Sequence, residues 1–205
     1  MKGAIFDLDG TILDSMAIWE TYGTSYLRSK GYECESELDE MFRAFSLRDA
    51  AIYCKNVLKS EMTVEEVMAD INKVAENFYF YQVPLKEGVK EYLDNLKKDG
   101  VKLCIATATD RHMTEAALKR NGIYELFEFI MTCTEVGAGK KEPLIFRKAL
   151  EKLGTSKEET VIFEDAIHAV ETAKKDGFKV FVIYDKFEKH PEEIKALADK
   201  YMLRW

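Results

Sequence analysis

The sequence predicts an α/β protein with a Rossmann-like, three-layer core, a parallel sheet and an inserted helical domain. Short apolar segments alternate along the chain with amphipathic patterns of helical period. The apolar segments are continuous, which is typical of parallel strands covered on both faces. Residues 15–83 interrupt this alternation with helical patterns and no convincing strand pattern.

Five short apolar segments predict the strands of the sheet. Four are strong, and the segment at 127–132 is a weaker fifth candidate. In chain order the predicted strands cover residues 3–8, 102–107, 127–132, 160–164 and 179–184.

Amphipathic patterns between these segments predict four helices of the core. Asp110 is the expected N-cap of the second, and Asp165 stands just before the fourth, where it could also serve as a cap. A glycine after the last apolar residue is a common helix stop. The expected stops are Gly100, Gly122, Gly154 and Gly177.

The region without strands predicts a separate helical cap domain. Thr63 precedes an apolar helical pattern, with Glu66 three residues later, which is the spacing of a capping box. We therefore expect an α/β core formed by residues 1–14 and 84–205, and a helical cap formed by residues 15–83.

Composition excludes several functional classes. Of 205 residues, 47% are hydrophobic, so the chain can bury a core. Lys and Arg number 30 against 37 Asp and Glu, a net charge of -7, which offers no electrostatic footprint for nucleic acid or an anionic membrane. The first apolar run is too short for a signal peptide, and the four cysteines lack metal-binding spacing. We expect a cytoplasmic protein with no obligatory protein partner.

Polar side chains gather where the predicted strands end. The segment "IFDLDGT" places Asp7 and Asp9 at the end of the first strand. In parallel α/β sheets, ligands bind beyond the carboxyl ends of the strands. Other strand ends or the loops that follow them add a hydroxyl, an ammonium group and two more carboxylates, from Thr107, Lys140, Glu164 and Asp165.

Electrostatics indicates what this set of side chains can do. Four carboxylates in one crevice cannot all stay ionised unless cations join them. Mg²⁺ with oxygen ligands is the natural partner, and Lys140 would add a second positive charge. Such a cradle suits a phosphoryl group, with Asp7 as nucleophile and Asp9 free to act as general acid and base. The pattern predicts phosphoryl transfer through an aspartyl-phosphate.

Four segments together resemble a known family. "FDLDGTILDS", "IATAT", "GKKEP" and "VIFEDA" are similar, in content and order, to the four motifs of the haloacid dehalogenase-like superfamily. Their spacing resembles the branch of phosphatases and phosphoglucomutase-like proteins that carry a helical cap after the first motif. The likeness spans nearly the whole chain.

The resemblance implies a role for each motif residue. Asp7 would be the nucleophile, and Asp9 the general acid and base. Thr107 and the adjacent Ala108 would bind the transferring phosphoryl group, while Lys140 would pair with that group and with Asp7. Mg²⁺ would be held by the Asp7 carboxylate, the Asp9 backbone carbonyl and Asp165, with Glu164 as either a direct or an outer ligand.

Two cap residues are candidates for substrate binding. Trp19, in "DSMAIW", stands where mutases of this branch usually carry a histidine, and Arg48, in "FSLRDA", matches part of a cap motif of that branch. The alternative for Trp19 is cap core, and for Arg48 a solvated ion pair. We expect a Mg²⁺-dependent phosphatase whose cap closes over a small phosphorylated metabolite such as a sugar phosphate. A phosphomutase and a non-enzymatic phospho-receiver are the alternatives.

Overall fold

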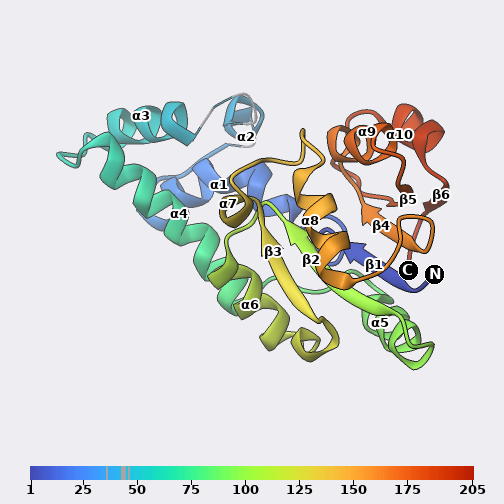
Figure 1. Cartoon of the computed structure of the whole chain (residues 1–205). Helices are drawn as coiled ribbons and strands as arrows, with labels where there is room; N and C mark the ends of the chain where they lie inside the picture. Colours follow the sequence, from blue (N-terminus) through green and yellow to red (C-terminus); the bar gives the residue numbers. More distant parts are fainter. Residues whose placement is uncertain (36, 43–44, 46) are drawn as a thin grey trace. The chain divides into compact units, whose positions relative to one another are not determined.

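The computed structural model describes residues 1–35, 37–42, 45 and 47–205 (Figure 1). These residues divide into two compact units. The first comprises Met1–Asp14 and Val83–Trp205, and the second comprises Ser15–Gln82.

The first unit is built on a parallel sheet of six strands in the order β3-β2-β1-β4-β5-β6 (Figure 1). The strands are β1 (Gly3–Phe6), β2 (Lys102–Thr107), β3 (Phe129–Thr132), β4 (Thr160–Glu164), β5 (Lys179–Ile183) and β6 (Lys200–Met202). The predicted α/β class with a parallel sheet is confirmed. All five expected strands form, the weak third one included.

The sixth strand was not predicted. It is three residues long, and only Met202 is buried while Lys200 is exposed. A segment this short has too few side chains to show the period of a strand. Its pairing with β5 gives it a place at the edge of the sheet.

Helices cover both faces of the sheet, which explains why the strands are apolar throughout. On one face, Ile5 and Ile162 lie in a cluster with residues of α8 (Leu144–Leu153) and α9 (Ile167–Lys175). Successive side chains of a strand point to opposite faces. Phe6 and Phe163 accordingly stack on the other face, 4.4 Å apart, where Tyr92 of α5 (Val89–Lys98) meets Phe163.

Glycines end the core helices as predicted. Gly154 caps α8 in the left-handed region with φ of 65°, and the other three expected glycines also have positive φ. The remaining helical elements of this unit are α6 (Arg111–Arg120), the 3₁₀ turn η1 (Tyr124–Leu126), α7 (Cys133–Val136) and α10 (Pro191–Leu197).

The two aspartates considered as helix caps have different outcomes: Asp110 is the N-cap residue of α6, as predicted, whereas Asp165 does not cap α9. Asp110 stands at the N-cap of α6, but its side chain makes no capping bond and instead accepts a hydrogen bond from Thr134 at 2.9 Å. The residue at the N-cap of α9 is Ala166, and Asp165 is turned to the strand ends described below. In both cases a longer-range partner competes for the carboxylate.

The second unit is helical over its described residues. Its helices are α1 (Met16–Ser29), α2 (Glu37–Phe42), α3 (Leu47–Leu58) and α4 (Val64–Tyr81). They enclose a separate core that includes Tyr26, Phe42, Cys54 and Ile71. None of the described helices in the chain is both long and apolar enough to cross a bilayer.

The predicted capping box at the start of α4 is confirmed. The Thr63 hydroxyl accepts a hydrogen bond from the Glu66 backbone N–H at 3.2 Å, and the Glu66 carboxylate accepts one from the Thr63 backbone N–H at 2.7 Å. Two otherwise unpaired donors of the first turn are satisfied in this way.

Replacing Thr63 should therefore destabilise the helical unit. Thr63→Ala removes the acceptor for the Glu66 N–H and should lower the free energy of unfolding by about 1 kcal/mol in urea denaturation followed by circular dichroism. Thr63→Ser keeps the hydroxyl and should stay close to the wild type. Equal losses in both variants would contradict the capping role.

Candidate active site

The strand order places the predicted site at the switch point of the sheet. β1 lies between β2 and β4, so the chain leaves β1 first to one side and later returns on the other. The carboxyl ends of these three neighbouring strands carry Asp7, Thr107 and Glu164. A crevice for ligands forms at such a point because the connecting segments diverge.

Lys140 connects two of the predicted carboxylates. Its ammonium group donates hydrogen bonds to the Asp7 carboxylate and to Glu164 Oε1, the second at 2.7 Å. All three side chains are buried, with residue exposures of 8% for Lys140, 7% for Asp7 and 1% for Glu164. A buried lysine keeps its charge only when anions compensate for lost hydration, and here two do so.

The Glu164 carboxylate is fixed by the backbone as well. Its Oε2 accepts hydrogen bonds from the backbone N–H groups of Asp165 at 2.9 Å and Ala166 at 3.1 Å. Both of its oxygens are thus engaged by protein donors. This geometry makes Glu164 an anchor that orients Lys140.

Asp165 completes a cluster of buried acids. Carboxylate oxygens of Asp7, Glu164 and Asp165 lie within 4.8 Å of one another. Asp165 Oδ1 also accepts a hydrogen bond from the Thr11 hydroxyl at 2.9 Å. Hard oxygen ligands at this spacing fit a divalent cation such as Mg²⁺. Thr11 was not singled out as a site residue, although its place in "DGT" after the two aspartates was a usable signal.

The charges of the cluster are not balanced by the protein alone. Burial, partly offset by Lys140, raises the pKa of Asp7 to about 7, with Glu164 and Asp9 contributing in the same direction. Burial also raises the pKa of Asp165, and Asp7 and Glu164 add to it. Three buried acids against one lysine leave room for a further cation, so the residues present fit a bound metal.

Despite burial, the pKa of Lys140 is raised by its two anionic neighbours, Asp7 and Glu164. Burial lowers its pKa, but the charges and hydrogen bonds of Asp7 and Glu164 outweigh that effect and hold the pKa above its usual range. The lysine is therefore cationic at neutral pH. It supplies a positive charge in the crevice.

Asp9 faces a different set of partners. Its carboxylate is outside the acid cluster and accepts a hydrogen bond from the Thr109 hydroxyl at 2.5 Å. The Thr109 backbone N–H in turn donates to the Thr107 hydroxyl oxygen at 3.0 Å, while Ala108 between them is exposed. Thr109 is a second site residue that sequence reasoning missed, although the repeat in "TAT" offered a second hydroxyl.

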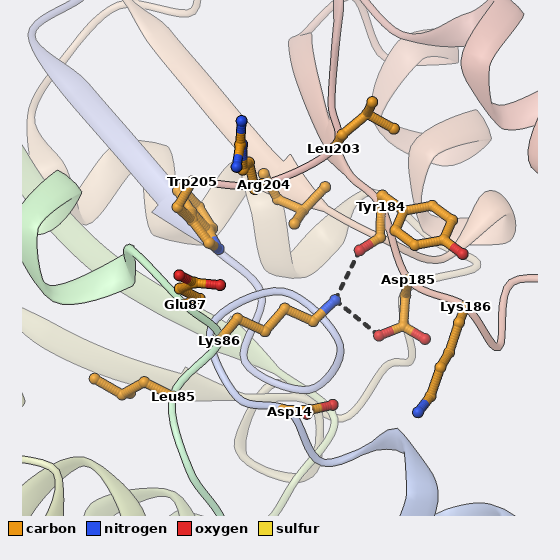
Figure 2. Close-up of a pocket in the computed structure, with 11 residues that line it drawn as sticks. Asp14, Leu85, Lys86, Glu87, Tyr184, Asp185, Lys186, Leu203, Arg204 and Trp205 are labelled. Atoms are coloured by element: carbon orange, nitrogen blue, oxygen red, sulfur yellow. Dashed lines mark hydrogen bonds and ion pairs between the residues drawn. The ribbon is translucent and has the colours of Figure 1, made fainter.

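A lysine not singled out in the sequence adjoins the acid cluster. Lys86 pairs with Asp185 at 2.7 Å and donates to the Tyr184 carbonyl at 2.9 Å, as Figure 2 shows. It is close enough to Asp165 to lower the pKa of that carboxyl slightly, against the larger effects of burial and neighbouring acids. These residues line a surface pocket of about 450 Å³ beside the strand ends.

The two candidate substrate residues, Trp19 and Arg48, lie in the helical unit. The Trp19 indole N–H donates to the Tyr79 hydroxyl at 2.9 Å, and the ring is half-buried. Arg48 pairs with Glu65 at 2.9 Å, with side-chain exposures of 60% and 68%. Their contact with a substrate stays a prediction.

Fold and site together define a class: α/β enzymes that work at the switch point of a parallel sheet with a buried lysine and clustered acids. A family model described as "Haloacid dehalogenase-like hydrolase" matches residues 4–183. The chain belongs to the haloacid dehalogenase-like hydrolase family.

Its relatives include proteins named as phosphatases. The chain is 25% identical over 153 residues to the phosphorylated carbohydrates phosphatase of Thermotoga maritima, covering 75% of this chain and 71% of that protein. It is 26% identical over 157 residues to hexitol phosphatase B of Escherichia coli, covering 73% and 68%. The chain is similar in fold to a Thermotoga maritima structure proposed to be a beta-phosphoglucomutase, with a TM-score of 0.85, 24% identity and coverage of 98% and 94%.

The raised pKa of Asp165 makes stability depend on pH in the metal-free protein. Because the pKa of Asp165 is higher in the folded state than its ordinary value of 3.8, the protonated carboxyl favours folding. This stabilisation is lost progressively as the pH rises from 3.8 through the raised pKa of the folded state. Asp165→Asn cannot ionise. Its free energy of unfolding should therefore rise relative to the wild type between about pH 5 and about pH 8, measured by urea denaturation with a chelator present.

The matched control is the exposed Asp99, replaced by asparagine. Asp99→Asn should differ from the wild type by the same amount at both pH values. If the difference in free energy of unfolding between Asp165→Asn and the wild type did not change with pH, the pKa of Asp165 would not be raised in the folded protein.

Proposed function

We propose that the protein is a Mg²⁺-dependent phosphatase that hydrolyses a small phosphorylated metabolite through an aspartyl-phosphate on Asp7. The observation that carries the proposal is the buried contact of Lys140 with Asp7 and Glu164 beside a separate, hydroxyl-bound Asp9. One carboxylate contacts the buried ammonium group, and the other is bound by a hydroxyl instead.

The two aspartates would then divide the reaction. Asp7 attacks phosphorus, forming a new P–O bond as the ester oxygen departs, and Asp9 gives that oxygen its proton. Asp9, now ionised, takes a proton from water, and the hydroxide attacks phosphorus and releases inorganic phosphate from Asp7. Thr107 and the Ala108 segment would hold the phosphoryl oxygens, while Lys140 offsets their charge.

Mg²⁺ would be held by the carboxylates of Asp7 and Asp165 and by the backbone carbonyl of Asp9. Glu164, whose oxygens already accept hydrogen bonds from Lys140 and two backbone N–H groups, would act from the outer shell. When bound, the cation would polarise the phosphoryl oxygens and neutralise the excess charge of the acids.

The names of the relatives support a phosphorylated carbohydrate or polyol as the substrate class. Residues of the helical unit would supply the selection among such compounds. We retain Trp19 and Arg48 as the first positions to test for substrate contact. The hydrogen bond from Trp19 to Tyr79 would fix the orientation of the indole ring. A flat aromatic surface of this kind packs well against the apolar face of a sugar ring.

The activity can be tested directly with p-nitrophenyl phosphate and a panel of sugar monophosphates. The wild type should release phosphate only with Mg²⁺ present. Asp7→Asn should reduce turnover to background, because an amide cannot act as the nucleophile. The exposed Asp99→Asn is the control and should retain full turnover.

The same assay separates hydrolysis from its nearest alternative. A phosphomutase would convert a sugar monophosphate to an isomer without net release of phosphate. Trp19 in place of the histidine usual in mutases argues for hydrolysis. Isomer formation without release, or no turnover on the whole panel, would overturn the phosphatase proposal.

Thr109 provides a further test of the role of Asp9. Thr109→Val removes the hydroxyl that orients the Asp9 carboxylate and should lower kcat about tenfold, the effect of one lost hydrogen bond. KM should change little, because Asp9 does not bind the ground-state phosphate in this scheme. Thr109→Ser keeps the donor and should restore most of kcat; failure of that rescue would count against the role.

A further inference from the structure

We propose that Trp205 is a positioning residue for the metal site, and that its indole N–H fixes the loop after β1 and thereby the Asp165 carboxylate. The inference rests on the metal role of Asp165 in the proposed function. It adds a residue far from the four motifs, at position 205 of the sequence.

The Trp205 ring packs directly behind the catalytic strand ends. Its centroid lies 5.6 Å from that of Phe163, nearly parallel at 30°, and 5.9 Å from that of Phe6. Each of these phenylalanines immediately precedes an acid of the cluster, Glu164 and Asp7 respectively. The indole therefore supports the two strands at the point where both turn into the site.

A chain of hydrogen bonds runs from the indole to the acid cluster. Trp205 Nε1 donates to the backbone carbonyl of Thr11 at 3.1 Å. The hydroxyl of the same Thr11 donates to Asp165 Oδ1 at 2.9 Å. Because Thr11 is fully buried, movement of its carbonyl would move the hydroxyl that holds Asp165.

The surroundings are shaped to receive this tryptophan. Gly88, the N-cap of α5, has φ of 85°, and a Cβ added there would lie 3.1 Å from the Trp205 Cβ and from its backbone oxygen. Tyr92 of the same helix meets the indole with ring centroids 4.9 Å apart. Figure 2 shows Trp205 in the wall of the pocket that also contains Lys86.

Packing and positioning can be separated by substitution. Phenylalanine at position 205 retains an aromatic ring between Phe6 and Phe163 but lacks the N–H donor. If the residue serves only as core, that change affects stability alone. If the N–H positions Thr11, the change also lowers the affinity of the Asp165 site for a divalent cation.

The experiment is a titration of the metal-free protein, residues 1–205, with Mg²⁺ by calorimetry, supported by the Mg²⁺-dependent shift in Tm. Trp205→Phe should raise the Kd for Mg²⁺ about three- to tenfold. This is smaller than the roughly 10- to 100-fold loss seen when a direct hydrogen-bond partner of a metal ligand is removed, because Trp205 acts through Thr11. The control is Phe181→Leu, which removes a ring contact with Phe163 from β5 and should lower Tm without changing the Kd.

A double-mutant cycle tests the route through Thr11. Thr11→Val removes the hydroxyl that donates to the Asp165 carboxylate and should itself raise the Kd. If Trp205 acts through Thr11, adding Trp205→Phe should raise the Kd no further, whereas independent effects would multiply. An unchanged Kd in Trp205→Phe, multiplied effects in the double variant, or no Mg²⁺ binding by the wild type would each overturn the inference.

The first two outcomes are distinct from failure of the proposed function, because Mg²⁺ binding is measured without turnover. Absence of Mg²⁺ binding by the wild type would reject the metal role in both. Mg²⁺ binding that depends on Trp205, without phosphate release from any ester, would leave the positioning role intact and reject only the phosphatase.

Discussion

The contact of one buried ammonium group with two buried carboxylates organises the whole site. Lys140 comes from the loop before α8, Asp7 from the end of β1 and Glu164 from the end of β4. Three segments that are distant in the sequence therefore meet at one ammonium group. None of these groups could be buried alone without a large desolvation cost. Their mutual compensation is incomplete, because two carboxylates face one ammonium group, and this leaves room for a further cation.

The parallel sheet makes this convergence possible. Because β1 stands between β2 and β4, the ends of the three strands meet at the same edge, and both faces are covered by helices that exclude water. The backbone beyond the strands then supplies the finer positioning. Two N–H groups hold Glu164, the Thr11 hydroxyl holds Asp165, and the Thr109 hydroxyl holds Asp9.

Much of this architecture was predictable from local patterns. Continuous apolar segments gave five strands, glycines marked the ends of the core helices, and the threonine and glutamate at 63 and 66 formed their capping box. Strand β6 and the hydrogen-bond partners of Asp110 and Asp165 could not be predicted, for a common reason. A short edge strand depends on its neighbour, and a carboxylate near a helix start takes whichever donor the fold brings closest.

By itself, the sequence determined the fold class, the order of the motifs and the identity of the acids, lysine and hydroxyl available for chemistry, because these follow from residue type and short-range spacing. Only the tertiary structure decided which groups meet. In the folded chain, Lys140 donates hydrogen bonds to Asp7 and Glu164. Thr109 donates to Asp9, and Trp205 donates to the Thr11 carbonyl. The pairings of Lys140 with Asp7 and of Trp205 with Thr11 span 133 and 194 residues, so they form only when the sheet brings these distant segments together.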